Sequence, residues 1–266
     1  MKNIGMIAGN GRFPFLVAEE IKKQGDKVIT VALKEEADKA IEDKSDKTYW
    51  LSVGKLQKII DALKENDVDT AVMVGQVKHA RIYSAITMDF RAMKVMGSLI
   101  NKKTDTILGA VVREFEKDGI KFLPSHVYLK HLLAEKGLIV GKKLNSDETK
   151  DAEFGFKTAK GIAGLDIGQT VVVKDKSVLA VESIEGTDEC IKRAFVLGGE
   201  NAIVAKVAKP NQDFRFDVPV IGLNTVDTLK NNKIRAMVVE AGATLILDKE
   251  TVIKKAEEAG VTVIGF

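Results

Sequence analysis

The sequence predicts an α/β protein, with a Rossmann-like N-terminal domain over residues 1–136 and a mixed α/β C-terminal domain over residues 137–266. Three observations support this prediction. The chain opens with an apolar run, a glycine-rich turn, an amphipathic helix and a second apolar run, which is the opening of a doubly wound sheet. Short apolar runs then alternate with helical patterns to the end of the chain. A polar stretch rich in Gly, Lys and Asp, residues 137–151, separates the two halves.

The N-terminal half contains five expected strands, each a short and mostly apolar run. They cover residues 2–8, 28–33, 49–53, 70–75 and 121–123. Apolar residues three and four positions apart predict the helices between them. These cover residues 14–25, 55–65, 104–119 and 125–132. We interpret the methionine-rich stretch 82–100 as core packing, with an acyl-chain groove as the alternative.

A turn of Gly9, Asn10 and Gly11 links the first strand to the first helix. A dinucleotide fingerprint GxGxxG starting at Gly9 would need glycine where Pro14 stands. Two interpretations stay open: a tight turn, or a phosphate or nucleotide group bound at the helix N-terminus. The three turn residues are candidates for substrate binding. Lys78 is another, because it follows the fourth strand, and open α/β sheets bind ligands at the carboxyl ends of strands.

The C-terminal half is predicted to begin with a helix and a β-hairpin, followed by alternating strands and helices. The expected strands cover residues 170–173, 178–181, 202–207, 218–223, 236–239, 244–247 and 261–265. The expected helices cover residues 151–163, 187–197, 227–232 and 249–259. No internal repeat or low-complexity segment interrupts this pattern.

An acidic turn lies between the hairpin and the next helix. Glu182, Glu185 and Asp188 fall within seven residues, and Thr187 or Asp188 is the expected N-cap. Three carboxylates are more than a cap requires. They are either solvated or available as ligands.

The segment 209–223 is the least ordinary part of the chain. It carries Lys209, Gln212, Asp213, Arg215 and Asp217 between two apolar runs. Opposed charges held between core segments are costly to bury unless a bound group or a partner satisfies them. A metal ion or a phosphate would do so, and the alternative is a structural ion pair at the domain junction between Arg215 and Asp217.

The available ligands favour a hard cation. Asp213, Asp217, Glu182 and Glu185 are candidate metal ligands, and carboxylates without Cys or His partners suit Mg²⁺ or Mn²⁺. The three histidines have no i, i+4 pair, which argues against a zinc site on a helix. A divalent ion together with Arg and Lys is typical equipment for stabilising charge in phosphoryl transfer.

Composition excludes several classes of protein. Hydrophobic residues make up 45% and charged residues 30% of 266 residues, which is a normal globular balance. Net charge is only +3 and basic residues are interleaved with acidic ones, so nucleic acid is not an expected partner. The single cysteine, Cys190, permits no disulfide framework. We expect a cytoplasmic protein, one that can still touch a membrane surface.

Four motifs resemble those of the LpxI family of UDP-2,3-diacylglucosamine pyrophosphatases, and the resemblance covers essentially the whole chain. They are VLAVESIEGTDECIKRA (178–194), KPNQDFRFDVPVIGLNTV (209–226), IGMIAGNGRFPFLVAEEIKKQGD (4–26) and AGATLIL (241–247). The resemblance implies a Rossmann-like domain, a second domain, a divalent ion, usually Mg²⁺, and an essential aspartate. That aspartate maps to Asp213 or Asp217. After the fourth strand the family often has a basic residue followed by proline, whereas this chain has Gln76-Val77-Lys78-His79.

The function expected from residues and resemblance together is Mg²⁺-dependent hydrolysis of UDP-2,3-diacylglucosamine to UMP and 2,3-diacylglucosamine 1-phosphate (lipid X) in lipid A synthesis. Gln212, Asp213, Arg215 and Asp217 are the expected catalytic residues. Thr187, Asp188 and Lys209 join the glycine turn and Lys78 as expected substrate-binding residues. A homodimer and transient contact with a membrane surface are also expected. The alternatives are a nucleotide-sugar-binding or regulatory protein without catalysis and, third, a nicotinamide oxidoreductase.

Overall fold

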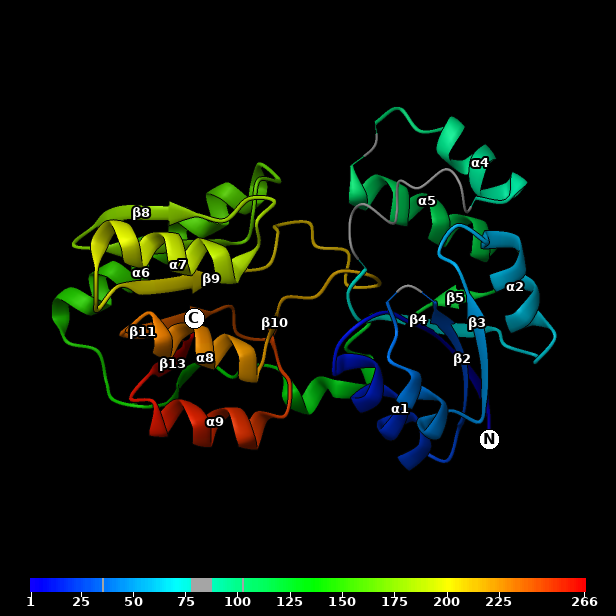
Figure 1. Cartoon of the computed structure of the whole chain (residues 1–266), viewed down its shortest axis with the longest axis horizontal. Coiled ribbons are helices and arrows are strands. Elements are labelled where there is room, and N and C mark those ends of the chain that lie inside the picture. The colour runs from blue at the N-terminus through cyan, green and yellow to red at the C-terminus, as the bar shows by residue number, and fades with distance from the viewer. Residues whose placement is uncertain (35, 78–87, 102) are drawn as a thin grey trace. The chain divides into compact units, whose positions relative to one another are not determined.

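A computed structural model describes residues 1–34, 36–77, 88–101 and 103–266 (Figure 1). The chain divides into two compact units. The N-terminal unit contains Met1–Leu129 together with Asp213–Asp217, and the C-terminal unit contains Lys130–Gln212 and Val218–Phe266. The segment Asp213–Asp217 was predicted within the C-terminal half, but it packs with the N-terminal unit. No helix in the described part of the chain is long and apolar enough to cross a membrane.

The N-terminal unit is built on a parallel five-stranded sheet in the order β3-β2-β1-β4-β5. Its elements up to Phe122 are β1 (Asn3–Ala8), α1 (Phe13–Lys23), β2 (Lys27–Leu33), η1 (Lys39–Lys44), β3 (Lys47–Leu51), α2 (Leu56–Lys64), β4 (Thr70–Val74), α4 (Phe90–Gly97), α5 (Thr104–Lys117) and β5 (Lys121–Phe122). This is the doubly wound arrangement that the alternating apolar runs predicted.

The two faces of this sheet pack against different helices. Along β2, the alternate residues Ile29, Val31 and Leu33 enter a core with α2, α4 and α5. Helix α1 packs against β1, β2 and β4 on the other face (Figure 1). Successive side chains of a strand point to opposite faces, so a strand covered on both sides is apolar throughout.

The C-terminal unit has a mixed six-stranded sheet in the order β6-β13-β11-β9-β7-β8, in which β9, β11 and β13 run parallel. A short parallel pair, β10 with β12, stands apart from it. From Val127 onward the elements are η3 (Val127–Leu132), β6 (Gly137–Val140), α6 (Ser146–Gly164), β7 (Thr170–Lys174), β8 (Ser177–Val181), α7 (Thr187–Gly198), β9 (Ile203–Lys206), β10 (Val220–Ile221), α8 (Leu223–Asn231), β11 (Ala236–Val239), β12 (Leu245–Ile246), α9 (Lys249–Glu258) and β13 (Thr262–Gly265).

Alternation along the strands also sorts the core of this sheet. Ile203 and Ala205 of β9 pack on the side of α6, whereas Val204 packs on the side of α7, α8 and α9. The hairpin β7–β8 turns at Asp175 and Lys176, which both adopt positive φ, as a two-residue turn of type I′ requires. Both the hairpin and the mixed α/β character were predicted from the sequence.

The polar stretch predicted as a domain junction carries regular structure. It contains β6, which pairs antiparallel with β13, and the first turn of α6. Asn145 caps that helix: its side-chain oxygen accepts from the backbone N–H groups of Asp147 and Glu148 at 2.9 Å, and Glu148 accepts from the N–H of Asn145 at 2.8 Å. This capping box explains why the helix begins before the predicted position at residue 151.

Candidate functional site

The segment Asp213–Asp217 is held to the N-terminal unit by Ser125, a residue that is only 2% exposed. The backbone N–H of Ser125 donates to the carbonyl oxygen of Phe214 at 2.7 Å. Its hydroxyl group lies 2.9 Å from the carbonyl oxygen of Arg215 and 2.6 Å from that of Met73 at the end of β4. One serine therefore joins the segment to the carboxyl end of a central strand, the edge at which such sheets bind ligands.

Two aromatic rings anchor the same segment. The ring of Phe214 meets His126 edge to face, with ring centroids 5.1 Å apart. Phe216 packs against the core on the α2, α4 and α5 side of the N-terminal sheet. Edge-to-face aromatic contacts and apolar burial both favour one fixed position for the backbone.

Arg215 forms a bidentate ion pair with the carboxylate of Asp213. Nη2 donates to Oδ2 at 2.7 Å and Nε donates to Oδ1 at 2.9 Å, and the backbone N–H of Arg215 also reaches Oδ1 at 3.1 Å. The remaining terminal nitrogen, Nη1, pairs with Glu116 of α5 at 3.1 Å. The hydrogen bonds from Arg215 hold the pKa of Asp213 below its usual value, so this carboxylate is ionised at neutral pH.

Asp217 follows Asp213 by one turn of backbone. Its N–H donates to the carbonyl oxygen of Asp213 at 3.1 Å, which closes an α-turn. Asp217 is half-buried. The structural alternative from the sequence paired Arg215 with Asp217, whereas the hydrogen bonds described for Arg215 involve Asp213 and Glu116.

The two other candidates in this loop belong to the C-terminal unit. The backbone N–H of Lys209 donates to Oε1 of Gln212 at 2.8 Å, and the N–H of Gln212 returns to the carbonyl oxygen of Lys209 at 3.1 Å. Nζ of Lys209 pairs with Asp166 at 2.8 Å. The predicted site residues are thus divided between the two units, with Lys209 and Gln212 in the C-terminal unit and Asp213–Asp217 in the N-terminal unit. Phe214 and Phe216 hold the second group in the N-terminal unit.

The acidic turn is folded onto its own backbone. Glu182 accepts from the N–H of Gln169 at 3.1 Å and from the hydroxyl group of Thr187 at 2.8 Å. Glu185 accepts from Arg193 Nη2 at 2.6 Å. Hydrogen bonds from its own backbone and from Arg193 lower the pKa of Glu185.

The predicted N-cap of the following helix was wrong. Gly186 is the N-cap of α7, and it adopts φ +85°, a conformation that favours glycine. Thr187 is instead the first helical residue, which leaves its hydroxyl group for the Glu182 contact. Asp188 lies in the first turn of α7, where the helix dipole favours negative charge.

Sequence reasoning missed Lys206, the last residue of β9. Its Nζ donates to the hydroxyl oxygen of Thr187 at 3.1 Å and to the carbonyl oxygen of Val220 at 3.1 Å. Thr170 lies in the same group, with its hydroxyl oxygen 3.2 Å from that of Thr187. Both described acceptors of Lys206 are neutral, although Thr187 in turn contacts Glu182.

A second lysine in this unit shows the contrast. Nζ of Lys160 lies 3.0 Å from both carboxylate oxygens of Glu240, so a carboxylate offsets its charge directly. Lys206 has no such direct partner among the described residues, and it ends a parallel strand at the carboxyl edge of the sheet. That position, directly after an apolar run, is the signal by which it could have been found.

The glycine turn of the N-terminal unit is tightly packed. The N–H of Gly9 donates to the carbonyl oxygen of Val74, and Asn10 exchanges both backbone hydrogen bonds with Gln76. A Cβ at Gly9 would lie 2.4 Å from the carbonyl oxygen of Gln76. Glycine is needed here for close backbone approach, and the N–H groups of Gly9 and Asn10 are already used. Substrate binding by Gly9, Asn10 and Gly11 stays a prediction, and Lys78 lies outside the described residues.

Asp213, Asp217, Glu182 and Glu185 stay predicted metal ligands. Within residues 1–34, 36–77, 88–101 and 103–266, no three His, Cys, Asp or Glu side chains form a group that could hold a metal ion. Asp213 and Asp217 lie in one unit and Glu182 and Glu185 in the other. Two carboxylates still fit Mg²⁺ of the kind that substrate phosphates help to coordinate. The ionised Asp213 has the oxygen-donor chemistry that this ion prefers.

Comparison with known proteins places the chain. Residues 3–132 match the model of the LpxI N-terminal domain, and residues 135–264 match the model of the LpxI C-terminal domain. A curated relative from Caulobacter vibrioides, named UDP-2,3-diacylglucosamine pyrophosphatase LpxI, is 31% identical over 276 residues, covering 100% of this chain and 98% of the relative. The chain belongs to the LpxI family. The resemblance recognised in its motifs is therefore confirmed.

Within this LpxI-family chain, the segment that carries Asp213–Asp217 matches the C-terminal domain in sequence but packs in the N-terminal unit. The solved structures that are similar include N5-carboxyaminoimidazole ribonucleotide synthetase from Thermotoga maritima (20% identity, 70% of this chain, 43% of that chain, TM-score 0.29). Biotin carboxylase from Campylobacter jejuni is another (14%, 73%, 41%, 0.31). The chain spans less than half of either protein.

Proposed function

We propose that this chain hydrolyses the pyrophosphate bond of UDP-2,3-diacylglucosamine. Water adds across the P–O–P linkage, and the products are UMP and 2,3-diacylglucosamine 1-phosphate, an intermediate of lipid A synthesis. The observation that carries this proposal is the full-length relationship to a curated UDP-2,3-diacylglucosamine pyrophosphatase. The ionised carboxylate of Asp213, fixed by Arg215, supports it because phosphoryl transfer depends on positioned charge.

In the N-terminal unit, the α-turn Asp213–Asp217 is the proposed reaction centre. It presents two carboxylates four residues apart on a backbone that Ser125 holds. Arg215 keeps Asp213 ionised, and Gln212 closes the turn before it through the N–H of Lys209. A carboxylate of this turn is proposed to accept the proton of the attacking water.

We further propose that Mg²⁺ assists the reaction, with Asp213 and Asp217 as the residues that would hold it. When bound, the ion would offset the negative charge that develops on the phosphate oxygens. The observations in support are the two carboxylates on one turn and the lowered pKa of Asp213. Removal of divalent ions with EDTA should abolish turnover, and added MgCl₂ should restore it.

In the C-terminal unit, Lys206 is the proposed ligand of a substrate phosphate. An ammonium group has three donors, and two of those of Lys206 are used by Thr187 and Val220. The third donor and the positive charge suit a phosphate oxygen. Thr187 and Glu182 orient Lys206, while Asp188 and Lys209 stay candidates for binding the rest of the substrate.

The test is product analysis by mass spectrometry after the purified protein is incubated with UDP-2,3-diacylglucosamine and MgCl₂. The proposal predicts equal amounts of UMP and the 1-phosphate. Tight binding of intact substrate with no product would instead favour a nucleotide-sugar-binding or regulatory protein. The predicted homodimer stays a prediction, which sedimentation analysis would test.

A further inference from the structure

Helix α4 (Phe90–Gly97) exposes large apolar side chains, whereas the methionine-rich stretch that contains it was interpreted as core. Phe90 is 80% exposed and Met93 is 51% exposed. Ile100, just beyond the helix, is fully exposed. Solvent exposure of three such side chains so close together is unfavourable unless another apolar phase covers them.

The helix has two distinct faces. Residues advance by about 100° per position in an α-helix, so Phe90, Met93 and Lys94 lie on one side. Ala92 and Val95 lie on the opposite side and are buried in the core of the N-terminal unit. The inner face of α4 is therefore packed in the core, and its outer face leaves apolar side chains exposed to solvent.

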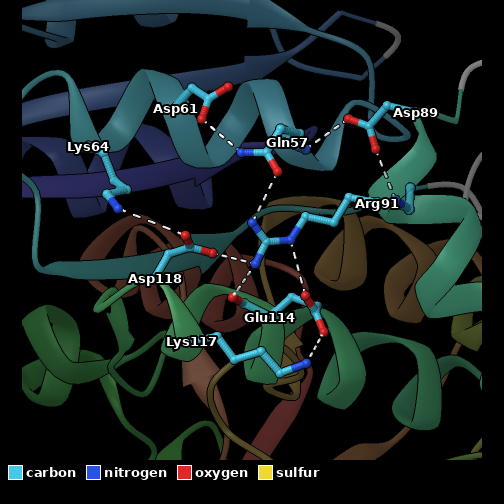
Figure 2. Close-up of polar contacts among 9 residues, drawn as sticks. Gln57, Asp61, Lys64, Asp89, Arg91, Glu114, Lys117 and Asp118 are labelled. Atoms are coloured by element: carbon cyan, nitrogen blue, oxygen red, sulfur yellow. Dashed lines mark hydrogen bonds and ion pairs between the residues drawn. The ribbon is translucent and has the colours of Figure 1, made fainter.

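A polar network fixes this helix in place (Figure 2). Nε of Arg91 donates to Glu114 of α5 at 3.0 Å, and Nη2 pairs with Asp118. Nη1 of Arg91 donates to Gln57 of α2 at 3.1 Å. Asp89 caps α4 by accepting from the N–H of Ala92 at 2.9 Å, and it also accepts from the N–H of Gln57 at 2.8 Å. The exposed face thus belongs to a helix that is held firmly against α2 and α5, and not to a frayed chain segment.

Charge identifies what the face fits. The sequence from Phe90 to Lys103 contains no acidic residue, and the exposed Lys94 lies on the same side of α4 as Phe90 and Met93. Arg91 turns inward to the carboxylates of α5 and contributes little to this outer charge. An apolar face bordered by lysines is typical of helices that lie in the headgroup region of an anionic bilayer.

We propose that the outer side of α4, formed by Phe90, Met93 and Lys94, together with Ile100 just beyond the helix, docks this protein on an anionic membrane surface. The inference rests on the proposed function for its purpose, because a substrate with two acyl chains resides in a bilayer and must be taken from it. The apolar side chains enter the boundary between headgroups and acyl chains, and Lys94 contacts lipid phosphates. Neither contact requires the reaction centre.

The experiment is flotation of the full-length protein with vesicles of phosphatidylethanolamine and phosphatidylglycerol, compared with vesicles of phosphatidylcholine alone. Wild-type protein should float with the anionic vesicles and be released by high salt. A variant carrying Phe90→Ser, Met93→Ser and Ile100→Ser should bind at least about tenfold more weakly. Lys94→Ala should weaken binding about fivefold.

The matched control carries Ile184→Ser, Val196→Ser and Leu197→Ser, which remove three exposed apolar side chains of the C-terminal unit. It should bind like wild type, and circular dichroism should show native folding for every variant. The proposal is overturned if wild type ignores anionic vesicles, or if the α4 variant binds as well as the control. It is also overturned if the α4 substitutions only convert a dimer to a monomer. Because flotation needs no turnover, failure of the proposed activity would be seen separately.

Discussion

Arg215 and Asp213, two residues apart in the sequence, form a bidentate ion pair. Nη2 donates to Oδ2 at 2.7 Å and Nε donates to Oδ1 at 2.9 Å. Arginine suits this role because its planar guanidinium group matches the geometry of a carboxylate. The pair lies on Asp213–Asp217, a segment that belongs to the N-terminal unit although the residues on either side of it belong to the C-terminal unit. This ion pair therefore keeps the proposed catalytic carboxylate of Asp213 ionised and holds it in one position.

The first prediction concerns the pH dependence of stability. The pKa of Asp213 is lowered in the folded state, so its ionisation stabilises the protein above the unfolded pKa of about 3.9. That contribution is lost as pH falls through the lower, folded pKa. Asp213→Asn should therefore reduce the free energy of unfolding at pH 7 by at most about 1 kcal/mol, since the pair is partly solvated. The deficit should disappear in strong acid, and urea unfolding of wild type and variant at both pH values measures it.

Ser125→Ala should loosen the α-turn. The buried hydroxyl group lies within hydrogen-bond distance of the carbonyl oxygens of Met73 and Arg215, which share its single proton. Its loss should lower the free energy of unfolding by about 1–2 kcal/mol. Turnover should fall as well, because the turn loses a contact that positions it. Ser98→Ala is the control: it removes the hydroxyl group of an exposed residue, which bonds to Val95 at the end of its own helix, and should change stability by less than about 0.5 kcal/mol. Equal effects of the two changes would contradict the anchoring role.

Gly75→Ala should be strongly destabilising, by about 2 kcal/mol or more. Gly75 has φ +91°, and a Cβ there would lie 2.7 Å from the carbonyl oxygen of Asn10. Gly161→Ala is the matched control, because Gly161 lies within α6 with nothing within 4 Å of an added Cβ. That change should raise stability by up to about 1 kcal/mol. Thermal unfolding of both variants checks that Gly75→Ala lowers the stability and that Gly161→Ala raises it.

Lys206→Met should lower kcat/KM by about a hundredfold, because a charged hydrogen bond to phosphate is lost. Lys206→Arg, which keeps the charge, should recover part of that loss. Lys192→Met removes an exposed lysine paired with Glu189 and should leave the kinetics unchanged. Steady-state kinetics with unchanged thermal unfolding would show that the effect is not structural, whereas wild-type kinetics of Lys206→Met would remove this residue from the proposal.

The fold was largely predictable because its strands are short apolar runs with clear ends. The run after Ala202 became β9, and the turn at Asp175 and Lys176 closed the predicted hairpin. Element starts were less predictable where caps decide them. The capping box of Asn145 and Glu148 lies in a stretch whose polarity indicated a linker.

The candidate residues were chosen from the sequence by residue type and not by location. Asp213 and Arg215 stood out because opposed charges lay between apolar runs. Their attachment to Ser125 joins residues about ninety positions apart, and no local pattern encodes such a contact. Lys206 was missed because the predicted strand, residues 202–207, enclosed it, so its position at the carboxyl end of β9 was not recognised.

The most direct test of the proposed reaction centre is UMP release by Asp213→Asn and Asp217→Asn, each measured singly at saturating substrate with MgCl₂. The proposal predicts that at least one change lowers kcat by about a hundredfold or more while the protein stays folded, as expected for loss of a general base. Asp147→Asn, which changes an exposed carboxylate paired with Lys150 in the first turn of α6, is the control and should retain turnover close to wild type. If both Asp213→Asn and Asp217→Asn turn over substrate at the wild-type rate, the α-turn Asp213–Asp217 is not the reaction centre.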